Sequence, residues 1–216
     1  MERTKGRPIP SGRVAPHEAF LLGAFSAGLG IVHLCLSVGM LPGFLSALTV
    51  VLYLVFYTPA KVKSPFCSVV GAVSGALPPL IGFSAASGEL TAGAWSLFAI
   101  LFLWQFPHLI SLSWLYRKDN ERAGMKMLPR GGRFALASAL LLFAAGFLPY
   151  FLGLSGPLYL LPSAALSGLY LYKSARFNGS ADTVSARGLF LTSIAYMPLL
   201  LASILIGHWG LPSLLP

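Results

Sequence analysis

The feature that most constrains this chain is a series of seven apolar segments, each close to the length of a membrane-spanning helix. They lie at residues 19–40, 42–57, 67–85, 94–115, 134–154, 157–172 and 189–209. A helix needs about 20 mostly apolar residues to cross the hydrocarbon core of a bilayer. The segments therefore predict an all-α, polytopic transmembrane bundle that forms a single membrane domain over residues 1–216.

Composition supports a membrane protein and argues against a soluble domain. Of the 216 residues, 56% are hydrophobic and only 10% are charged. Soluble domains carry about 25% charged residues, so this chain has too little polar surface to cover itself in water. Residues 1–18 are basic and contain Pro and Gly, without the short apolar core and cleavage site of a secretory signal.

The basic residues are confined to alternate connections between the apolar segments. All fifteen lie before the first segment (Arg3, Lys5, Arg7, Arg13), after the second (Lys61, Lys63), after the fourth (Arg117 to Arg133) or after the sixth (Lys173, Arg176, Arg187). The other connections hold no Lys or Arg and one acid, Glu89. By the positive-inside rule, the basic loops and residues 1–18 are cytoplasmic and the C-terminus is outside. Topology thus accounts for most of the net charge of +9, and we expect no nucleic-acid partner.

The third segment contains a stripe of small residues followed by a helix break. Small side chains recur at three- and four-residue spacing, which permits close helix packing in lipid; they are Ser68, Gly71, Ala72, Gly75 and Ala76. Pro78-Pro79 then breaks or kinks the helix, with either packing or a cavity around the freed carbonyls. Cys35 and Cys67 lie in different apolar segments and are expected to be small hydrophobic residues rather than a disulfide.

An ionisable residue, His108, lies within the fourth segment. It precedes Tyr116, at the inner end, by about 12 Å of helical rise, and Pro107 before it should loosen the local hydrogen-bond ladder. An intramembrane histidine is a candidate functional residue. The alternative is a neutral histidine that is hydrogen-bonded to a neighbouring helix, and position alone does not decide between the two.

Two further polar stretches lie on the predicted inner face. Asp119 and Glu121 lie among basic residues and suit a Mg²⁺-bridged diphosphate, because carboxylates bind Mg²⁺ and Arg or Lys binds phosphate oxygens. Arg3 and Arg7 are four residues apart, which would place both on one face of a helix. The alternatives are a solvated charged loop and an ordinary basic juxtamembrane tail.

These stretches resemble the protohaem IX farnesyltransferase (haem O synthase) branch of the UbiA superfamily of intramembrane prenyltransferases. The resemblance rests on MERTKGRPIPSG, YTPAKVKS with GALPPLIG, WQFPHLISLSWLYRKDNERAGMKMLP and ARGLFLTSIAYMPLLL, in order across nearly the whole chain. It implies a bundle with seven of the family's nine helices. Because the sequence shows no transit segment, we expect this bundle in a bacterial or archaeal plasma membrane. The resemblance also implies transfer of a farnesyl group from farnesyl diphosphate to a vinyl group of haem B, with Mg²⁺ as cofactor, giving haem O. Haem A synthase or a terminal oxidase assembly would be the partners.

The resemblance also assigns roles to single residues. Arg3 and Arg7 match the RT..RP arginines and, with Lys61 and Tyr57 of YT..K, are the expected diphosphate-binding residues. Asp119 matches the acid of the second polar loop, a candidate Mg²⁺ ligand or substrate-orienting group, and Tyr116 accompanies it. Together with His108, these two are the expected catalytic residues. His108 matches the PH histidine, with a haem-facing role.

The sequence departs from the family pattern in three places. The second base after YT..K is Lys63 rather than residue 62, and Lys126 stands where Pro is common before MLP. The family's N…D…D motif, which carries the principal Mg²⁺-binding acids, has no counterpart before RT..RP. We therefore expect a fragment of a complete enzyme that begins at an internal methionine and is weak or inactive alone. The alternatives are a truncated, inactive gene product and an assembly in which another chain supplies the two helices.

Two other functions compete with this interpretation. One is a UbiA-type prenyltransferase that acts on an aromatic quinone precursor, which the PH histidine and the MLP block oppose. The other is a non-catalytic membrane protein, such as a transporter or an assembly scaffold.

Overall fold

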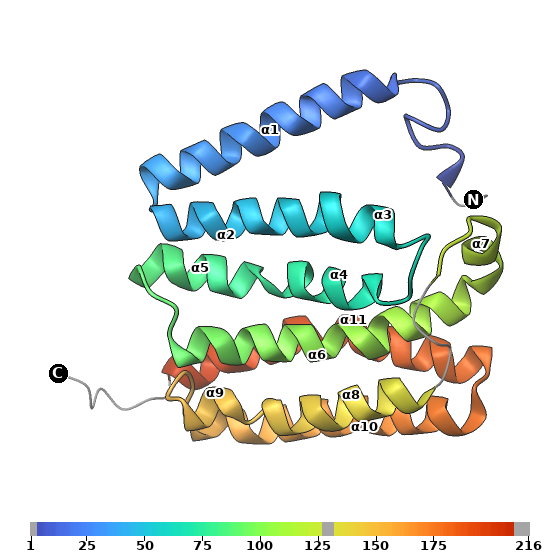
Figure 1. The fold of residues 1–216 in the computed structure, drawn as a ribbon. Coiled ribbons are helices and arrows are strands. Elements are labelled where there is room, and N and C mark those ends of the chain that lie inside the picture. The colour runs from blue at the N-terminus through green and yellow to red at the C-terminus, as the bar shows by residue number, and fades with distance from the viewer. Residues whose placement is uncertain (1–3, 127–131, 210–216) are drawn as a thin grey trace. The chain divides into compact units, whose positions relative to one another are not determined.

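The computed structural model describes residues 4–126 and 132–209, and no strand occurs in these two ranges. The chain divides into two compact units, Met1–Glu89 with Tyr116–Met127 (unit 1) and Leu90–Leu115 with Leu128–Pro216 (unit 2). The helices are seen in Figure 1. Unit 1 holds α1 (Pro16–Ser37), α2 (Met40–Val51), the π-helix η2 (Leu52–Tyr57), α3 (Thr58–Ala60), α4 (Cys67–Ala76), α5 (Pro78–Ser87) and α7 (Arg117–Arg122). Unit 2 holds α6 (Ala92–Leu115), α8 (Gly132–Ala145), α9 (Leu148–Phe151), the 3₁₀-helix η3 (Pro157–Tyr159), α10 (Leu160–Ser180) and α11 (Thr183–Trp209).

Unit 1 is built from three long helical runs that follow one another in the chain. The turn after α1 returns the chain so that Gly43 of α2, which has no Cβ, lies directly against the sulfur and backbone of Cys35. The second run continues through α2, η2 and α3 from Met40 to Ala60, which is longer than the predicted 42–57 segment. The third run, α4 and α5, is interrupted at Leu77 because Pro78 and Pro79 follow. The predicted break is therefore confirmed.

The π-helix in unit 1 has a local cause. A proline inside a helix lacks its N–H and its ring clashes with the carbonyl four residues earlier, and Pro59 lies just after η2. Over Leu52–Tyr57 the helix is a π-helix, in which each backbone N–H donates to the carbonyl five residues earlier. Both the backbone N–H and the hydroxyl of Thr58 donate to the carbonyl of Tyr53. Such π segments frequently occur at functional sites.

Unit 2 is joined by side-chain hydrogen bonds between helices. The hydroxyls of Tyr159 and Ser163 both donate to the carbonyl of Gly146, at 2.6 and 2.7 Å. The Ser167 and Tyr196 hydroxyls lie 3.0 Å apart across α10 and α11. Interhelical hydrogen bonds in membrane proteins contribute about 0.6 kcal/mol each on average, so the effect of these bonds is mainly to fix which helix faces meet.

Six helical runs in the described residues are long and apolar enough to cross a membrane. They match the predicted segments except 157–172, where η3 and α10 form a helix of sufficient length but lower apolar content. Serines on its buried face and Lys173 and Arg176 toward its end lower that content. The chain is an integral membrane protein, while seven spans and a single domain remain predictions.

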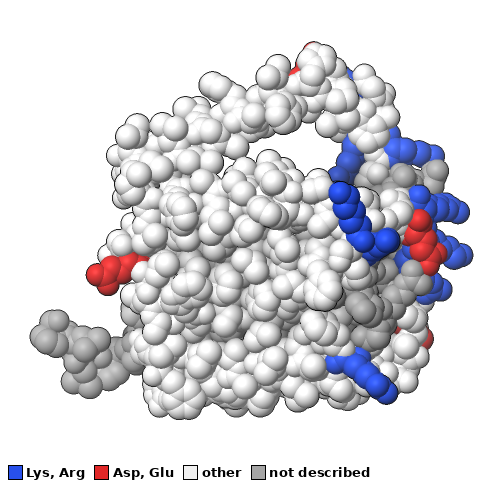
Figure 2. Space-filling view, in the orientation of Figure 1, with Lys and Arg blue, Asp and Glu red and all other residues white. Residues whose placement is uncertain are grey.

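Basic side chains gather at one end of unit 1. Lys61 and Lys63 lie in the α3–α4 connection, and Arg117, Lys118 and Arg122 lie on α7. Figure 2 shows Lys and Arg atoms together at this end. Successive helical runs of unit 1 point in opposite directions, so every second connection lies at the same end. Basic residues confined to alternate connections therefore cluster at one end.

Candidate active site

Two polar loops that the sequence singled out are tied together in unit 1. The backbone N–H of Lys126 donates to the carbonyl of Lys61 at 2.8 Å. The thiol of Cys67, which is free and buried, donates to the carbonyl of Lys126 at 3.7 Å. The connection that carries Lys61 is thereby held to the segment that follows Asp119.

A turn at Gly124 directs the chain so that Lys126 reaches the carbonyl of Lys61. After α7, Gly124 has a φ of +64°, a left-handed conformation that costs an L-residue with a side chain about 1–2 kcal/mol. The N–H of Gly124 donates to the backbone carbonyl of Glu121, and that of Met125 donates to the backbone carbonyl of Asn120, both at 3.0 Å. These bonds close the C-terminal end of α7 in a Schellman-type cap, after which the chain reaches Lys126.

Tyr57 lies at the end of the π-helix, and its ring packs on α4. Gly71 leaves room for that ring, because a Cβ at this position would lie 2.9 Å from two of the ring carbons. Tyr53 packs against Tyr57 within the same run, with ring centroids 5.2 Å apart. Part of the small-residue stripe therefore serves packing, as predicted, and Gly71 specifically seats a candidate substrate-binding residue.

The N-terminal segment folds back on itself at the same end of unit 1 (Figure 1). The guanidinium of Arg13 donates to the carbonyl of Gly6 at 2.7 Å and to the Ser11 hydroxyl at 3.1 Å. Arg7 is exposed and, with Thr4, lines a pocket of about 610 Å³ otherwise bounded by apolar residues. Arg3, the other predicted arginine, lies outside the described residues.

Asp119 and Tyr116 lie at the start of α7. Tyr116 is the N-cap residue and is 38% exposed, while Asp119 occupies the first turn and is half-buried. Within residues 4–126 and 132–209, no three His, Cys, Asp or Glu side chains are grouped as a metal ion would need. The described residues thus do not form a Mg²⁺ site by themselves, since Asp119 offers one carboxylate and an ion would need further oxygens.

His108 lies in unit 2, on α6, and is half-buried. Its Nδ1 is 2.7 Å from the hydroxyl oxygen of Ser193 on α11. Its ring stacks between Trp104 and Phe190, with centroids 4.9 and 5.2 Å away. The hydrogen bond to a neighbouring helix that the sequence offered as an alternative is therefore present. The helix α6 also continues through Pro107.

Sequence reasoning missed the residues that surround His108. Trp104 precedes the histidine by four residues, so helical spacing could have placed it on the same face. Ser193 and Phe190 are more than eighty residues away in the chain, and no local pattern connects them with the histidine. The link from Cys67 and Lys126 to Lys61 was missed for the same reason.

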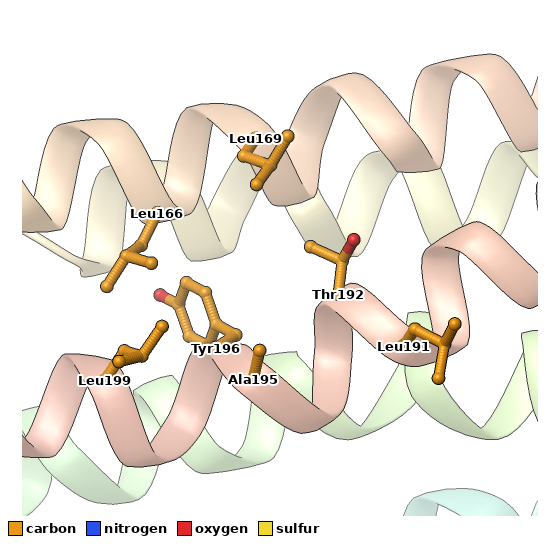
Figure 3. Close-up of a pocket in the computed structure, with 7 residues that line it drawn as sticks. All are labelled: Leu166, Leu169, Leu191, Thr192, Ala195, Tyr196 and Leu199. Carbon is orange, nitrogen blue, oxygen red and sulfur yellow. The ribbon is translucent and has the colours of Figure 1, made fainter.

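Unit 2 contains an apolar groove between α10 and α11. It has a volume of about 290 Å³ and is shown in Figure 3, where five aliphatic side chains accompany Thr192 and Tyr196. The Tyr196 hydroxyl is within hydrogen-bonding distance of Ser167. The groove therefore suits hydrocarbon, and it brings no set of reacting groups together.

Comparison with known proteins agrees with this helical membrane fold. The UbiA prenyltransferase family matches residues 1–204. A protoheme IX farnesyltransferase of Solibacter usitatus is 41% identical over 218 residues, covering 98% of this chain and 75% of that protein. One of Opitutus terrae is 41% identical over 222 residues, with coverage of 99% and 75%. The chain belongs to the UbiA prenyltransferase family.

The fold itself has a counterpart of known structure. A solved structure of digeranylgeranylglyceryl phosphate synthase aligns with a TM-score of 0.79, covering 97% of this chain and 77% of that one. The two sequences are 20% identical, so this likeness shows the shared fold and nothing of the substrate.

Proposed function

We propose that this chain transfers a farnesyl group from farnesyl diphosphate to a vinyl group of haem B, giving haem O. The observation that carries the proposal is the 41% identity to proteins named protoheme IX farnesyltransferase, over nearly all of this chain. The alignment includes the loops with Lys61 and Asp119 and the span with His108. The PH histidine and the MLP block oppose a quinone-precursor substrate.

The unit-1 end that carries α3 and α7 would receive the diphosphate. Arg7 and Lys61 offer cationic donors, which stabilise negative charge as it develops on a departing diphosphate. Tyr57, whose ring packs on Gly71, would orient the farnesyl group or the diphosphate of the substrate beside Arg7 and Lys61. The bond between Lys126 and Lys61 supports this proposal because it holds the two polar loops in one place.

We include Mg²⁺ in the proposal as an ion that would bind together with the diphosphate of the substrate. When bound, the ion would neutralise charge on the diphosphate oxygens, and Asp119 would supply one carboxylate ligand. Tyr116, next to α7, would assist at the same face. The apolar surroundings of the helices would limit the access of water to the allylic cation that forms when diphosphate leaves.

His108 would face the haem. The vinyl group would attack the farnesyl carbon whose bond to diphosphate has broken. A water would then add to the resulting cation and release a proton, giving the hydroxyethylfarnesyl side chain. The charge pattern favours a plasma-membrane orientation with the basic loops in the cytoplasm and the C-terminus outside. Delivery of the product to haem A synthase or to an oxidase remains a prediction.

The test is to incubate membranes that contain the chain with farnesyl diphosphate and Mg²⁺, offering haem B or 4-hydroxybenzoate. We expect a low yield of farnesylated haem by mass spectrometry, because the described residues do not form a Mg²⁺ site by themselves, and no prenylated benzoate. His108→Ala should abolish the haem product, because the haem-facing side chain is lost. Farnesylated benzoate without farnesylated haem would overturn the proposal, and near-normal haem product from folded His108→Ala would remove His108 from the site.

A further inference from the structure

The contacts around Ser193 favour one of the two neutral forms of His108. The Ser193 hydroxyl has one hydrogen, and it donates to the carbonyl of Phe190 at 2.6 Å. A carbonyl can only accept, so that hydrogen is no longer available to the imidazole. The 2.7 Å contact with His108 is then a hydrogen bond only if Nδ1–H donates and the serine oxygen accepts.

The opposite arrangement makes fewer hydrogen bonds. If the serine donated to Nδ1, its bond to Phe190 would be lost. The neutral imidazole carries one proton, so the Nδ1–H form leaves Nε2 with an unprotonated lone pair. Both side-chain bonds are made in this form, and it is therefore the favoured tautomer in the structure.

Ring packing restricts the imidazole further. Trp104 and Phe190 stack on the ring with interplanar angles of 21° and 29°. The indole N–H of Trp104 also donates to the carbonyl of Ser193 at 2.9 Å, and the Tyr170 hydroxyl donates to the carbonyl of Trp104 at 2.9 Å. The ring is thus held by stacking and by the Nδ1 bond, and with the proton on Nδ1 the lone pair of Nε2 is the atom of the imidazole that can coordinate a metal.

We propose that Ser193 is a positioning residue that holds neutral His108 in the Nδ1–H form, so that Nε2 coordinates the iron of the haem substrate. A neutral imidazole with its other nitrogen hydrogen-bonded is a common ligand for iron. Partners of this kind fix the tautomer and the ring orientation of the ligand, and their loss typically weakens metal affinity about 10- to 100-fold. The identity of the ligand rests on the proposed function, whereas the tautomer does not.

The first measurement reads the tautomer directly, without substrate. The chain is labelled with ¹⁵N-histidine in detergent, and the His108 ring signals are assigned by their loss in His108→Gln. We expect a protonated Nδ1 and an unprotonated Nε2 in the wild type and in Ser193→Thr, and a mixture of tautomers in Ser193→Ala. An unprotonated Nδ1 in the folded wild-type chain would overturn the proposal.

The second measurement is a titration with ferric haem B, followed by absorption and electron paramagnetic resonance. We expect an imidazole-ligated spectrum that His108→Gln abolishes, and haem binding about 10- to 100-fold weaker in Ser193→Ala. Ser193→Thr should bind close to wild type. Ser203→Ala is the matched control, because Ser203 is another buried serine of α11 whose hydroxyl donates to its own helix at Leu200.

The outcomes separate this proposal from the proposed function. Farnesylated haem without an imidazole-ligated spectrum would overturn the ligand role alone. Imidazole ligation together with farnesyl transfer to 4-hydroxybenzoate and not to haem would overturn the proposed function alone. Equal weakening in Ser193→Ala and Ser203→Ala, with no change of tautomer, would reduce Ser193 to a packing residue and overturn the proposal.

Discussion

The seating of Tyr57 on Gly71 gives a prediction whose size can be worked from the structure. An alanine Cβ at position 71 would lie 2.9 Å from two carbons of the Tyr57 ring. Carbon atoms pack without strain at about 3.5 Å or more, so the ring must move by about 0.6 Å. A misplacement of about 1 Å can cost a hundredfold in rate. We therefore expect Gly71→Ala to lower kcat/KM for farnesyl diphosphate about tenfold, or about 1.4 kcal/mol in activation free energy.

The free energy of unfolding should fall by no more than about 2.5 kcal/mol. Overpacking costs about 1–3 kcal/mol, while replacing a helical glycine by alanine returns about 0.5–1 kcal/mol. Gly82→Ala is the matched control, because Gly82 lies on α5 with nothing within 4 Å of its Cβ position. We expect it to keep wild-type kcat/KM and to raise the melting temperature slightly.

The assay combines steady-state farnesyl transfer with thermal unfolding in detergent. In a Tyr57→Ala background, Gly71→Ala should have no further effect on kcat/KM, since the effect acts through the ring. The reasoning fails if Gly71→Ala keeps kcat/KM within about twofold of wild type, or if its effect is the same with and without the Tyr57 ring.

Three further predictions concern connections between helices. Gly124→Ala should destabilise the α7 cap by about 1–2 kcal/mol, which protease cleavage after α7 would detect. Lys61→Gln should raise KM for farnesyl diphosphate about tenfold, because a charged hydrogen bond contributes about 1.5–3 kcal/mol, whereas Lys173→Gln on α10 should leave it unchanged. Backbone and side-chain hydrogen bonds from Ser185 hold the pKa of Asp182 below its usual value. The ionised Asp182 carboxylate therefore stabilises the folded protein above about pH 3.9, the pKa of the unfolded chain. This stabilisation is lost as pH falls through the lower pKa of Asp182 in the folded protein. Melting temperature should accordingly fall more on acidification in the wild type than in Asp182→Asn.

Each of these predictions has a control and a contradicting result. Gly28→Ala on α1, where a Cβ meets nothing within 4 Å, should not increase cleavage after α7, and equal cleavage in both variants would reject the cap. A Lys173→Gln effect as large as that of Lys61→Gln would mean that the cations act only through net charge. Parallel acid profiles of the wild type and Asp182→Asn would show that the hydrogen bonds to Asp182 do not contribute to stability.

Local sequence patterns determined where most of the helices lie, and they predict the side of the membrane on which the basic loops lie. Apolar runs of spanning length have one stable form in lipid, because each helix satisfies its own backbone hydrogen bonds. Pro78-Pro79 broke the third run at Leu77 for an equally local reason, the missing N–H groups. The motifs also marked Tyr57, Lys61, Asp119 and His108 before any contact was known, although their roles remain proposals.

Tertiary structure alone decided which groups meet. The bond from Lys126 to Lys61 and the contact of His108 with Ser193, 85 residues away in the chain, join segments with no shared period. The seating of Tyr57 on Gly71 depends on how α4 packs against the π-helix. A local pattern records which face of a helix is apolar and where it must end. It does not record which neighbour covers that face, and the tautomer of His108 depends on that neighbour.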